Sequence, residues 1–156
     1  MLEWDLPEPF TLAVQVLPEH IDGLRHTNNA VYVSWCEQVA WAHSTALGLD
    51  LDSYQRLNRA MVITHSEFDY LQASRLGDKL QVATWIDAWD GRLTMQRRFQ
   101  LVRPADASTL LRARMSFACV ALDSGRPRRL PPEFIDGYGK AVLDDQVSAN
   151  CGTRRS

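Results

Sequence analysis

The chain has 156 residues, a length that favours one domain with a hydrophobic core large enough to fold without disulfides or metal. Its 17 Lys and Arg residues and 19 Asp and Glu residues give a net charge of −2, with both signs scattered along the chain. This balance argues against nucleic acid or an anionic membrane as a partner, because both select for a concentrated basic surface. We expect a single domain over residues 1–145 and a loose tail over residues 146–156.

The cysteines and the N-terminal sequence favour a cytoplasmic location. Cys36, Cys119 and Cys151 lie far apart and form no C-x-x-C pair of the kind that binds zinc or does redox work. The N-terminal MLEWDLPEPF lacks the basic region and apolar run of a signal peptide, and no later apolar stretch is long enough to span a bilayer. We therefore predict a cytoplasmic protein with reduced thiols and no membrane insertion.

The first half of the chain predicts a strand, a polar loop and a long helix. Residues 11–17 alternate in the manner of a strand, which Pro18 ends. The loop EHIDGLRHTNN follows, and Asn28 or Asn29 is placed to cap a helix that Gly48 ends, roughly five turns later. Because this helix is apolar around most of its circumference, with only a narrow polar stripe, we expect it to be buried.

The second half predicts strands. After a polar connector, extended segments cover residues 61–71, 79–89, 93–103 and 110–122, and a short helix over residues 131–140 closes the chain. In the last strand the odd residues from Leu111 to Ala121 are apolar and alternate with Arg112, Arg114 and Ser116, so one face is buried and the other is wet. Asp90-Gly91 is a hairpin signal, which implies antiparallel neighbours.

These elements predict an α+β fold in which an antiparallel sheet of five or six strands wraps around one long central helix. The helix needs burial on most sides, and each strand supplies one apolar face. Such a sheet leaves its edge strands unpaired, so we expect a homodimer that joins two sheets, or a tetramer built from that dimer.

The loop and helix start, Asp22 followed by GLRHTNNAVYVSW, resemble the D-x-x-G-H-x-N-N-x-x-Y signature of the hotdog-fold thioesterases. The likeness is to the 4-hydroxybenzoyl-CoA thioesterase group, which includes the FadM- and YbgC-like acyl-CoA thioesterases. The segments QASRLGDKLQV and GRPRRLP are similar to later parts of the same family, so the resemblance spans nearly the whole chain. The chain departs from the family at His20, where Asp is frequent, and at Arg25, where glycine is frequent.

The resemblance implies an acyl-CoA thioesterase that hydrolyses a fatty or aromatic acyl thioester, at a site on the dimer interface, with no metal and no cofactor. Asp22 is then the catalytic carboxylate, acting as general base for water or as nucleophile, and the sequence leaves both routes open. The N–H of Asn29, in the first turn of the helix, is placed to polarise the thioester carbonyl. Taken without the family, Asp22 is better explained as a loop anchor or cap.

Neighbouring residues have structural explanations beside the functional ones. His26 can tune Asp22, hold a substrate carbonyl or bond the loop backbone, and Asn28 and Asn29 suit a helix cap for local reasons. Tyr32 is a candidate to line an acyl tunnel, whereas core packing is the better explanation for Trp35. Glu37 is either a second acid or base, or a partner for a charge across the dimer.

Arginines are candidates to bind the phosphates of coenzyme A, because guanidinium groups match phosphate oxygens. The candidates are Arg75, Arg97, Arg98, Arg126, Arg128 and Arg129. Within this set we single out Arg128 and Arg129, in the cluster GRPRR. His20, Asp22 and His26 also have metal-ligand chemistry, but their spacing matches no metal motif.

Two other functions stay open: a hotdog protein that binds or senses acyl-CoA without cleaving it, and a hotdog hydratase, which the Asp22 and His26 spacing also suggests. The sequence leaves undetermined the acyl chain and the choice between coenzyme A and acyl carrier protein.

Overall fold

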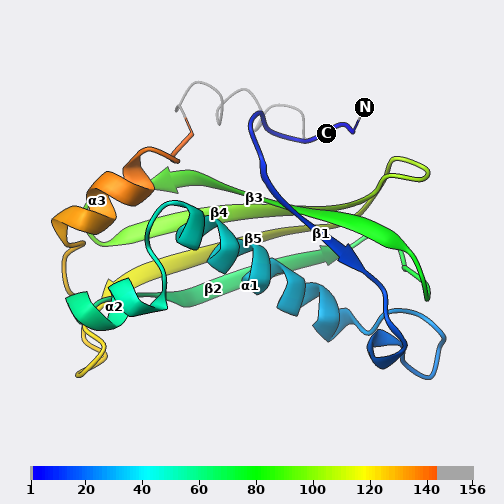
Figure 1. Cartoon of the computed structure of the whole chain (residues 1–156), viewed down its shortest axis with the longest axis horizontal. Helices are drawn as coiled ribbons and strands as arrows, with labels where there is room; N and C mark the ends of the chain where they lie inside the picture. Colours follow the sequence, from blue (N-terminus) through cyan, green and yellow to red (C-terminus); the bar gives the residue numbers. More distant parts are fainter. Residues whose placement is uncertain (1, 144–156) are drawn as a thin grey trace.

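The structure is a computed structural model, and it describes residues 2–143. One strand and two α-helices precede a run of four strands along the chain (Figure 1). In order, the elements are β1 (Phe10–Gln15), the 3-10 helix η1 (Pro18–His20), α1 (Asn29–Ala46), α2 (Leu51–Leu57), β2 (Ala60–Tyr70), β3 (Lys79–Trp89), β4 (Thr94–Arg103), β5 (Ser108–Val120) and α3 (Pro132–Gly139). The predicted tail over residues 146–156 and Cys151 lie outside the described residues.

The five strands form one antiparallel sheet in the order β1-β3-β4-β5-β2, which curves around α1 (Figure 1). The predicted α+β architecture is therefore confirmed, with five strands. The pairing register shifts once in each of the β2–β5, β3–β4 and β4–β5 ladders. Such irregularities bend strands, which helps a sheet to wrap a helix.

Helix α1 lies against the inner face of the sheet and runs for 18 residues, as the sequence predicted. Its buried side chains are Tyr32, Trp35, Cys36, Val39 and Ser44. Trp35 is 3% exposed and belongs to the main core, so the expectation that it packs in the core is confirmed. Glu37, Gln38 and Trp41 are exposed on the opposite side.

The prediction of a polar connector after α1 was wrong, because residues 51–57 form helix α2. The Asp50 side chain caps this helix by accepting a hydrogen bond from the Ser53 N–H at 2.9 Å. Asn58, in the left-handed conformation with φ of 51°, follows its last turn. Within α2 only Tyr54 is buried. The helix therefore lacks the repeated apolar residues by which the sequence could have predicted it.

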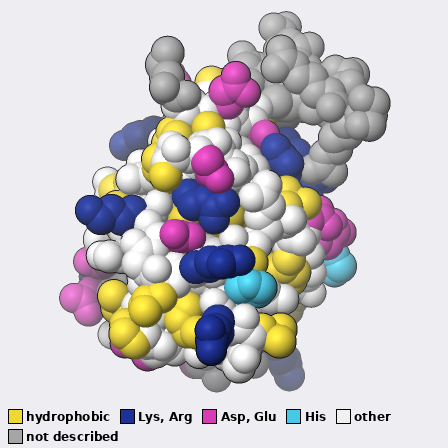
Figure 2. Space-filling model, turned by 90° about the vertical axis from the view of Figure 1, so that its right-hand side faces the viewer, with side chains coloured by type: hydrophobic (Ala, Val, Ile, Leu, Met, Phe, Trp, Pro, Cys, Tyr) yellow, Lys and Arg dark blue, Asp and Glu magenta, His cyan; other side chains and the backbone are white. Residues whose placement is uncertain are grey.

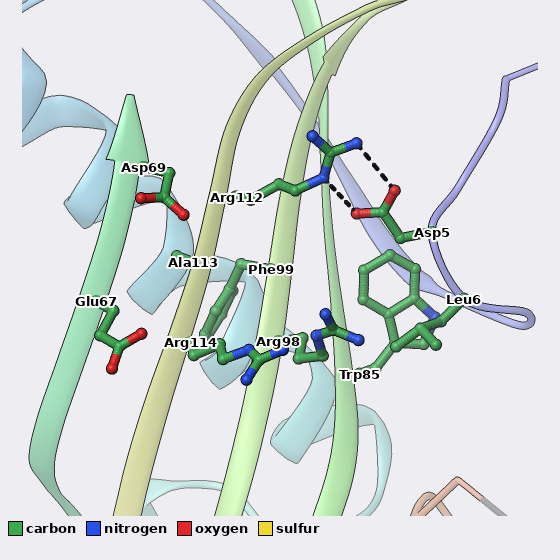
Figure 3. A pocket seen from close by; sticks show the side chains of 10 residues that line it. All are labelled: Asp5, Leu6, Glu67, Asp69, Trp85, Arg98, Phe99, Arg112, Ala113 and Arg114. Atoms are coloured by element: carbon green, nitrogen blue, oxygen red, sulfur yellow. Dashed lines mark hydrogen bonds and ion pairs between the residues drawn. The ribbon is translucent and has the colours of Figure 1, made fainter. Parts of the chain in front are cut away.

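The outer face of the sheet is less exposed to solvent than the sequence predicted. On β5 the odd residues from Leu111 to Cys119 are buried as predicted, but Arg112, Arg114 and Ser116 are half-buried rather than exposed. The N-terminal segment crosses this face, where Asp5 accepts two hydrogen bonds from Arg112 at 2.7 and 3.0 Å and Leu6 packs against Trp85 (Figure 3). The N-terminal segment thus covers charged and aromatic residues that the strand pattern places outside.

Strand β2 is one edge of the sheet, and most of it is exposed to solvent. From Val62 to Tyr70 every residue is exposed except the half-buried Phe68. Val62, Ile63 and Tyr70 are large hydrophobic side chains that are 38%, 42% and 42% exposed. This is the long, open and partly apolar edge that a sheet protein ordinarily covers.

Candidate active site

The loop before α1 is pinched closed at its base. An isolated antiparallel bridge joins Ile21 to Thr27, and the Asn28 N–H donates to the carbonyl oxygen of His20 at 2.8 Å. Inside the loop the Asp22 N–H donates to the carbonyl of His26 at 2.9 Å, and Arg25 has a positive φ of 62°. The backbone therefore fixes Asp22 close in sequence and in space to the start of α1.

The two carboxylate oxygens of Asp22 have different surroundings. Oδ1 accepts hydrogen bonds from the N–H groups of Leu24 at 2.9 Å and His26 at 3.4 Å, so Asp22 does anchor the loop. Among residues 2–143, Oδ2 has no hydrogen-bond partner, and the side chain is half-buried rather than enclosed. The anchoring function thus occupies one oxygen and leaves the other for chemistry.

The first turn of α1 offers an unused donor. Asn28 is the N-cap, because its side-chain oxygen accepts from the Ala30 N–H at 2.9 Å. Asn29 is the first residue of the helix, is exposed, and within the described chain its N–H has no acceptor. A free N–H at the positive end of an 18-residue helix is suited to hold a developing negative charge.

A buried row of hydroxyl groups supports this end of the helix. The Ser74 hydroxyl is 2.7 Å from the Thr27 hydroxyl and 2.8 Å from that of Tyr32, and the Thr27 N–H donates to the Ser74 carbonyl at 2.9 Å. Tyr32 is 2% exposed and stacks on Trp35 and Tyr70. Its contacts are those of a core residue, so its substrate role stays a prediction. Sequence reasoning missed Ser74, which no local pattern marks.

The histidines of the loop differ in what they bind. His20 Nδ1 accepts the Leu17 N–H at 2.9 Å, and its ring packs edge-on against Trp35. The half-buried His26 imidazole has no hydrogen bond within residues 2–143. In that part of the chain no three His, Cys, Asp or Glu side chains are grouped to hold a metal ion. Charged, histidine and hydrophobic side chains intermingle on the end of the molecule from which α1 starts (Figure 2).

Arg128 and Arg129 are exposed, but they lie at the other end of α1 from Asp22. Their segment follows β5, and the carbonyl of Arg129 accepts from the Nε of Arg59, just after α2 (Figure 1). Within one chain the structure does not bring them together with the loop. Arg97, another candidate for the coenzyme A phosphates, is not at the surface, because it faces inward and is 1% exposed.

The structure contains cavities on both faces of the sheet. The outer one, beside Asp5 and Arg112, has a volume of about 30 Å³, room for about one water molecule, and the Nε of Arg114 is buried there without a partner among the described residues (Figure 3). The inner one lies beside the C-terminal half of α1, has a volume of about 270 Å³ and is lined mostly by apolar side chains. The inner cavity is large enough to receive part of a substrate, as is a third cavity of about 320 Å³ beside Pro7, His43 and Lys140.

Comparison with known families decides the assignment. The model of the thioesterase-like superfamily matches residues 16–137, which include the loop, α1 and all strands from β2 to β5. The chain belongs to the thioesterase-like superfamily. The fold is the hotdog fold, so both the resemblance and the fold predicted from the sequence are confirmed.

Individual proteins are similar to the chain over different lengths. The long-chain acyl-CoA thioesterase FadM of Escherichia coli (strain K12) is 24% identical over 133 residues, which cover 83% of this chain and 96% of FadM. The protein THEM6 of Danio rerio is 30% identical over 86 residues, 54% of this chain, and the chain spans only about half the length of the THEM6 relatives that it matches.

A solved structure with a similar fold contains coenzyme A. The protein SAV2348 of Staphylococcus aureus, in complex with CoA, superposes with a TM-score of 0.78 at 21% identity and covers 89% of each chain. None of the helices within residues 2–143 combines the length and the apolar character needed to cross a bilayer.

Proposed function

We propose that this protein is an acyl-CoA thioesterase, which hydrolyses a fatty or aromatic acyl thioester to the free acid and coenzyme A. The observation that carries the proposal is that the closed loop and the first turn of α1 offer, seven positions apart, an Asp22 oxygen and an Asn29 N–H that no described residue bonds. Membership of the superfamily and the likeness to FadM support the reaction class. Cys36 and Cys119 are free thiols, which supports a cytoplasmic location.

Asp22 and the start of α1 have different roles in hydrolysis of the thioester. The Asn29 N–H donates to the carbonyl oxygen, which becomes negative as the tetrahedral intermediate forms. Asp22 either takes a proton from water as the water oxygen attacks the carbonyl carbon, or attacks that carbon itself to give an anhydride that water then opens. In both routes the carbon–sulfur bond breaks and the thiolate takes up a proton. His26, with no hydrogen bond of its own in the described chain, is a positioning candidate, as is Asn28, the cap.

A dimer through β2 completes the site in this proposal. The start of β2 lies beside Arg59 and the Arg128–Arg129 segment, and its end lies beside the loop, since Tyr70 stacks on Tyr32. Antiparallel pairing of two β2 edges about a twofold axis sets the start of one strand against the end of the other. Arg128 and Arg129 of one subunit then approach the Asp22 loop of its partner, where they can bind the phosphates of coenzyme A.

The dimer is tested by measuring the mass in solution. Light scattering after gel filtration is expected to give about 35 kDa, twice the chain mass of 17.7 kDa, or a multiple of it for a tetramer built from dimers. A mass of 17.7 kDa at the protein concentration used for activity assays would exclude a site shared between subunits.

The activity is tested with purified protein, a panel of acyl-CoAs of different chain length, and a reagent that reports free thiol. Asp22→Asn is expected to lower kcat by about 10²- to 10⁴-fold, the usual loss when a general base is removed. The asparagine oxygen can still accept from Leu24 and His26, so the loop should persist. Asp52→Asn, which alters an exposed carboxylate in α2, is the matched control and should keep full activity.

Two results would contradict the proposal. One is undiminished turnover by Asp22→Asn, which would remove Asp22 from the chemistry. The other is tight binding of an acyl-CoA by the unmodified protein with no thiol released, which would favour a sensor or carrier.

A further inference from the structure

The inner cavity of about 270 Å³ has an apolar wall and a polar floor. Its wall is formed by side chains such as Met61, Met95 and Phe117. Its mouth is exposed and includes Glu37 and the β2 residues Val62 and Ile63. Its floor consists of four polar residues that are each 5% exposed or less, namely Ser44, Tyr54, Arg97 and Tyr138.

Arg97 is a buried cation without a counter-charge among the described residues. It extends inward from β4, and its guanidinium donates to three neutral atoms: His43 Nδ1 at 2.9 Å, the Ser44 hydroxyl at 3.3 Å and the Thr84 hydroxyl at 3.4 Å. A guanidinium has five N–H groups, so two are left without an acceptor in residues 2–143. Glu37, at the mouth, makes no ion pair with Arg97.

The other floor residues present hydroxyl groups toward the same point. The Ser44 hydroxyl is 2.9 Å from that of Tyr138, which also hydrogen-bonds the hydroxyl of Tyr54. Burial raises the pKa of Tyr54, so its hydroxyl stays protonated and can donate. Burial lowers the pKa of Arg97 to about 10, which still leaves it positive at neutral pH. The floor is thus a set of donors around one positive charge.

A buried charge that has only neutral partners is costly unless an anion accompanies it. We propose that the cavity receives the acyl group and that Arg97 binds a carboxylate at the far end of that group. The favoured substrates are then thioesters of short dicarboxylic acids, with coenzyme A on one end only. This inference rests on the proposed thioesterase function, whose substrate class it specifies.

Size and position agree with this substrate class. Pockets for whole small molecules run from roughly 300 Å³ upward, so 270 Å³ suits a short acyl group rather than a complete acyl-CoA. The mouth lies at the β2 edge, where the proposed dimer brings the Asp22 loop of the partner subunit. The thioester would then react at the mouth while the carboxylate reaches the floor.

The test compares two substrates of equal chain length, hexanoyl-CoA and 5-carboxypentanoyl-CoA. The unmodified enzyme should have the higher kcat/KM for the carboxylate-ended substrate. Arg97→Met should lower that value by about 10- to 100-fold, the loss typical of a charge-assisted hydrogen bond, and leave hexanoyl-CoA within about twofold. An equal loss for both substrates, or a preference of the unmodified enzyme for hexanoyl-CoA, would overturn the inference.

Two further variants separate selectivity from folding. Arg92→Met removes an exposed arginine in the β3–β4 turn and should change neither substrate. Tyr54→Phe keeps the ring and removes one floor hydroxyl, so it should weaken only the carboxylate-ended substrate. If Arg97→Met does not fold, Tyr54→Phe takes its place, and a uniform effect of that variant on both substrates would count against the inference.

A binding measurement distinguishes failure of this inference from failure of the proposed function. Hexanedioic acid should raise the Tm of the unmodified protein more than hexanoic acid does, and this difference should disappear in Arg97→Met. If no acyl-CoA is hydrolysed but the Tm difference is seen, the thioesterase proposal fails and the carboxylate site stands. If hydrolysis is seen without any preference or Tm difference, the thioesterase proposal stands and the carboxylate site fails.

Discussion

Polar groups near the two ends of α1 differ in their exposure to solvent. At the start of the helix, Asp22 and Asn29 are accessible, and each retains a hydrogen-bonding atom that no described residue uses. Near its end, Ser44 and Arg97 are buried and bonded to neutral neighbours. Hydrolysis of the thioester needs groups that water and substrate can reach. Selection among acyl groups needs groups that are held rigidly out of water. We therefore assign reaction to the first end and selection to the second.

The largest effect is expected from a matched pair of serine variants, one at each end. Ser74→Ala leaves the Thr27 and Tyr32 hydroxyls short of a partner, and Ser44→Ala does the same to Tyr138 and Arg97. Each should lower the free energy of unfolding by about 1–3 kcal/mol, the cost of unsatisfied buried polar groups. In urea titrations both losses should appear, but only Ser74→Ala should lower kcat for hexanoyl-CoA.

The division between the two ends fails if Ser44→Ala lowers kcat for the methyl-ended substrate as much as Ser74→Ala does. Both ends would then belong to a single catalytic unit, and reaction and selection would no longer be separate.

A smaller effect is expected at the cap of α1. Asn28→Ala removes the acceptor of the Ala30 N–H and should lower stability by about 1 kcal/mol, whereas Asn28→Asp should restore it, since both residues cap well. Thermal unfolding of the three proteins measures this. If the alanine variant is as stable as the parent, the hydrogen bond at 2.9 Å contributes nothing to the start of the helix.

The last effect is a pH dependence at the buried end. Burial, assisted by the Arg97 charge, lowers the pKa of His43 to about 4 from its ordinary 6.5. Between these values the unfolded chain binds a proton that the folded chain does not. Stability should therefore be full above pH 6.5 and should fall as the pH drops toward 4.

His43→Asn is the control for that dependence, because its side-chain oxygen can accept from Arg97 but does not titrate. The urea midpoint of the parent should fall more between pH 7 and pH 5 than the midpoint of this variant. Identical profiles would show that His43 does not experience the desolvation that its position implies.

Local patterns account for most of what the sequence predicted. The apolar circumference of α1, the alternation along β5 and the Asp90-Gly91 turn are each encoded within a few neighbouring residues. The loop motif likewise predicted a helix cap at Asn28 or Asn29, and Asn28 is the cap. These features could be found because near neighbours in sequence determine them.

Features that depend on distant residues were not found. Ser74 meets Thr27 across 47 positions, and nothing in its own segment indicates that contact. Arg97 and Arg98 are adjacent arginines in one strand, and sequence alone does not say which of them faces inward. The register of β4 against β5 decides this, because Arg97 lies opposite the buried Met115 and Arg98 opposite Arg114.

Arg25 lies in the left-handed region of the backbone, with φ of 62°, where glycine is the usual residue. Only glycine adopts such a conformation without steric penalty, and other residues lose of the order of 1 kcal/mol or more. The loop of this chain accepts that conformational penalty at Arg25. In return it displays a guanidinium on the exposed part of the loop, three positions after the Asp22 carboxylate, where a glycine would have no side chain.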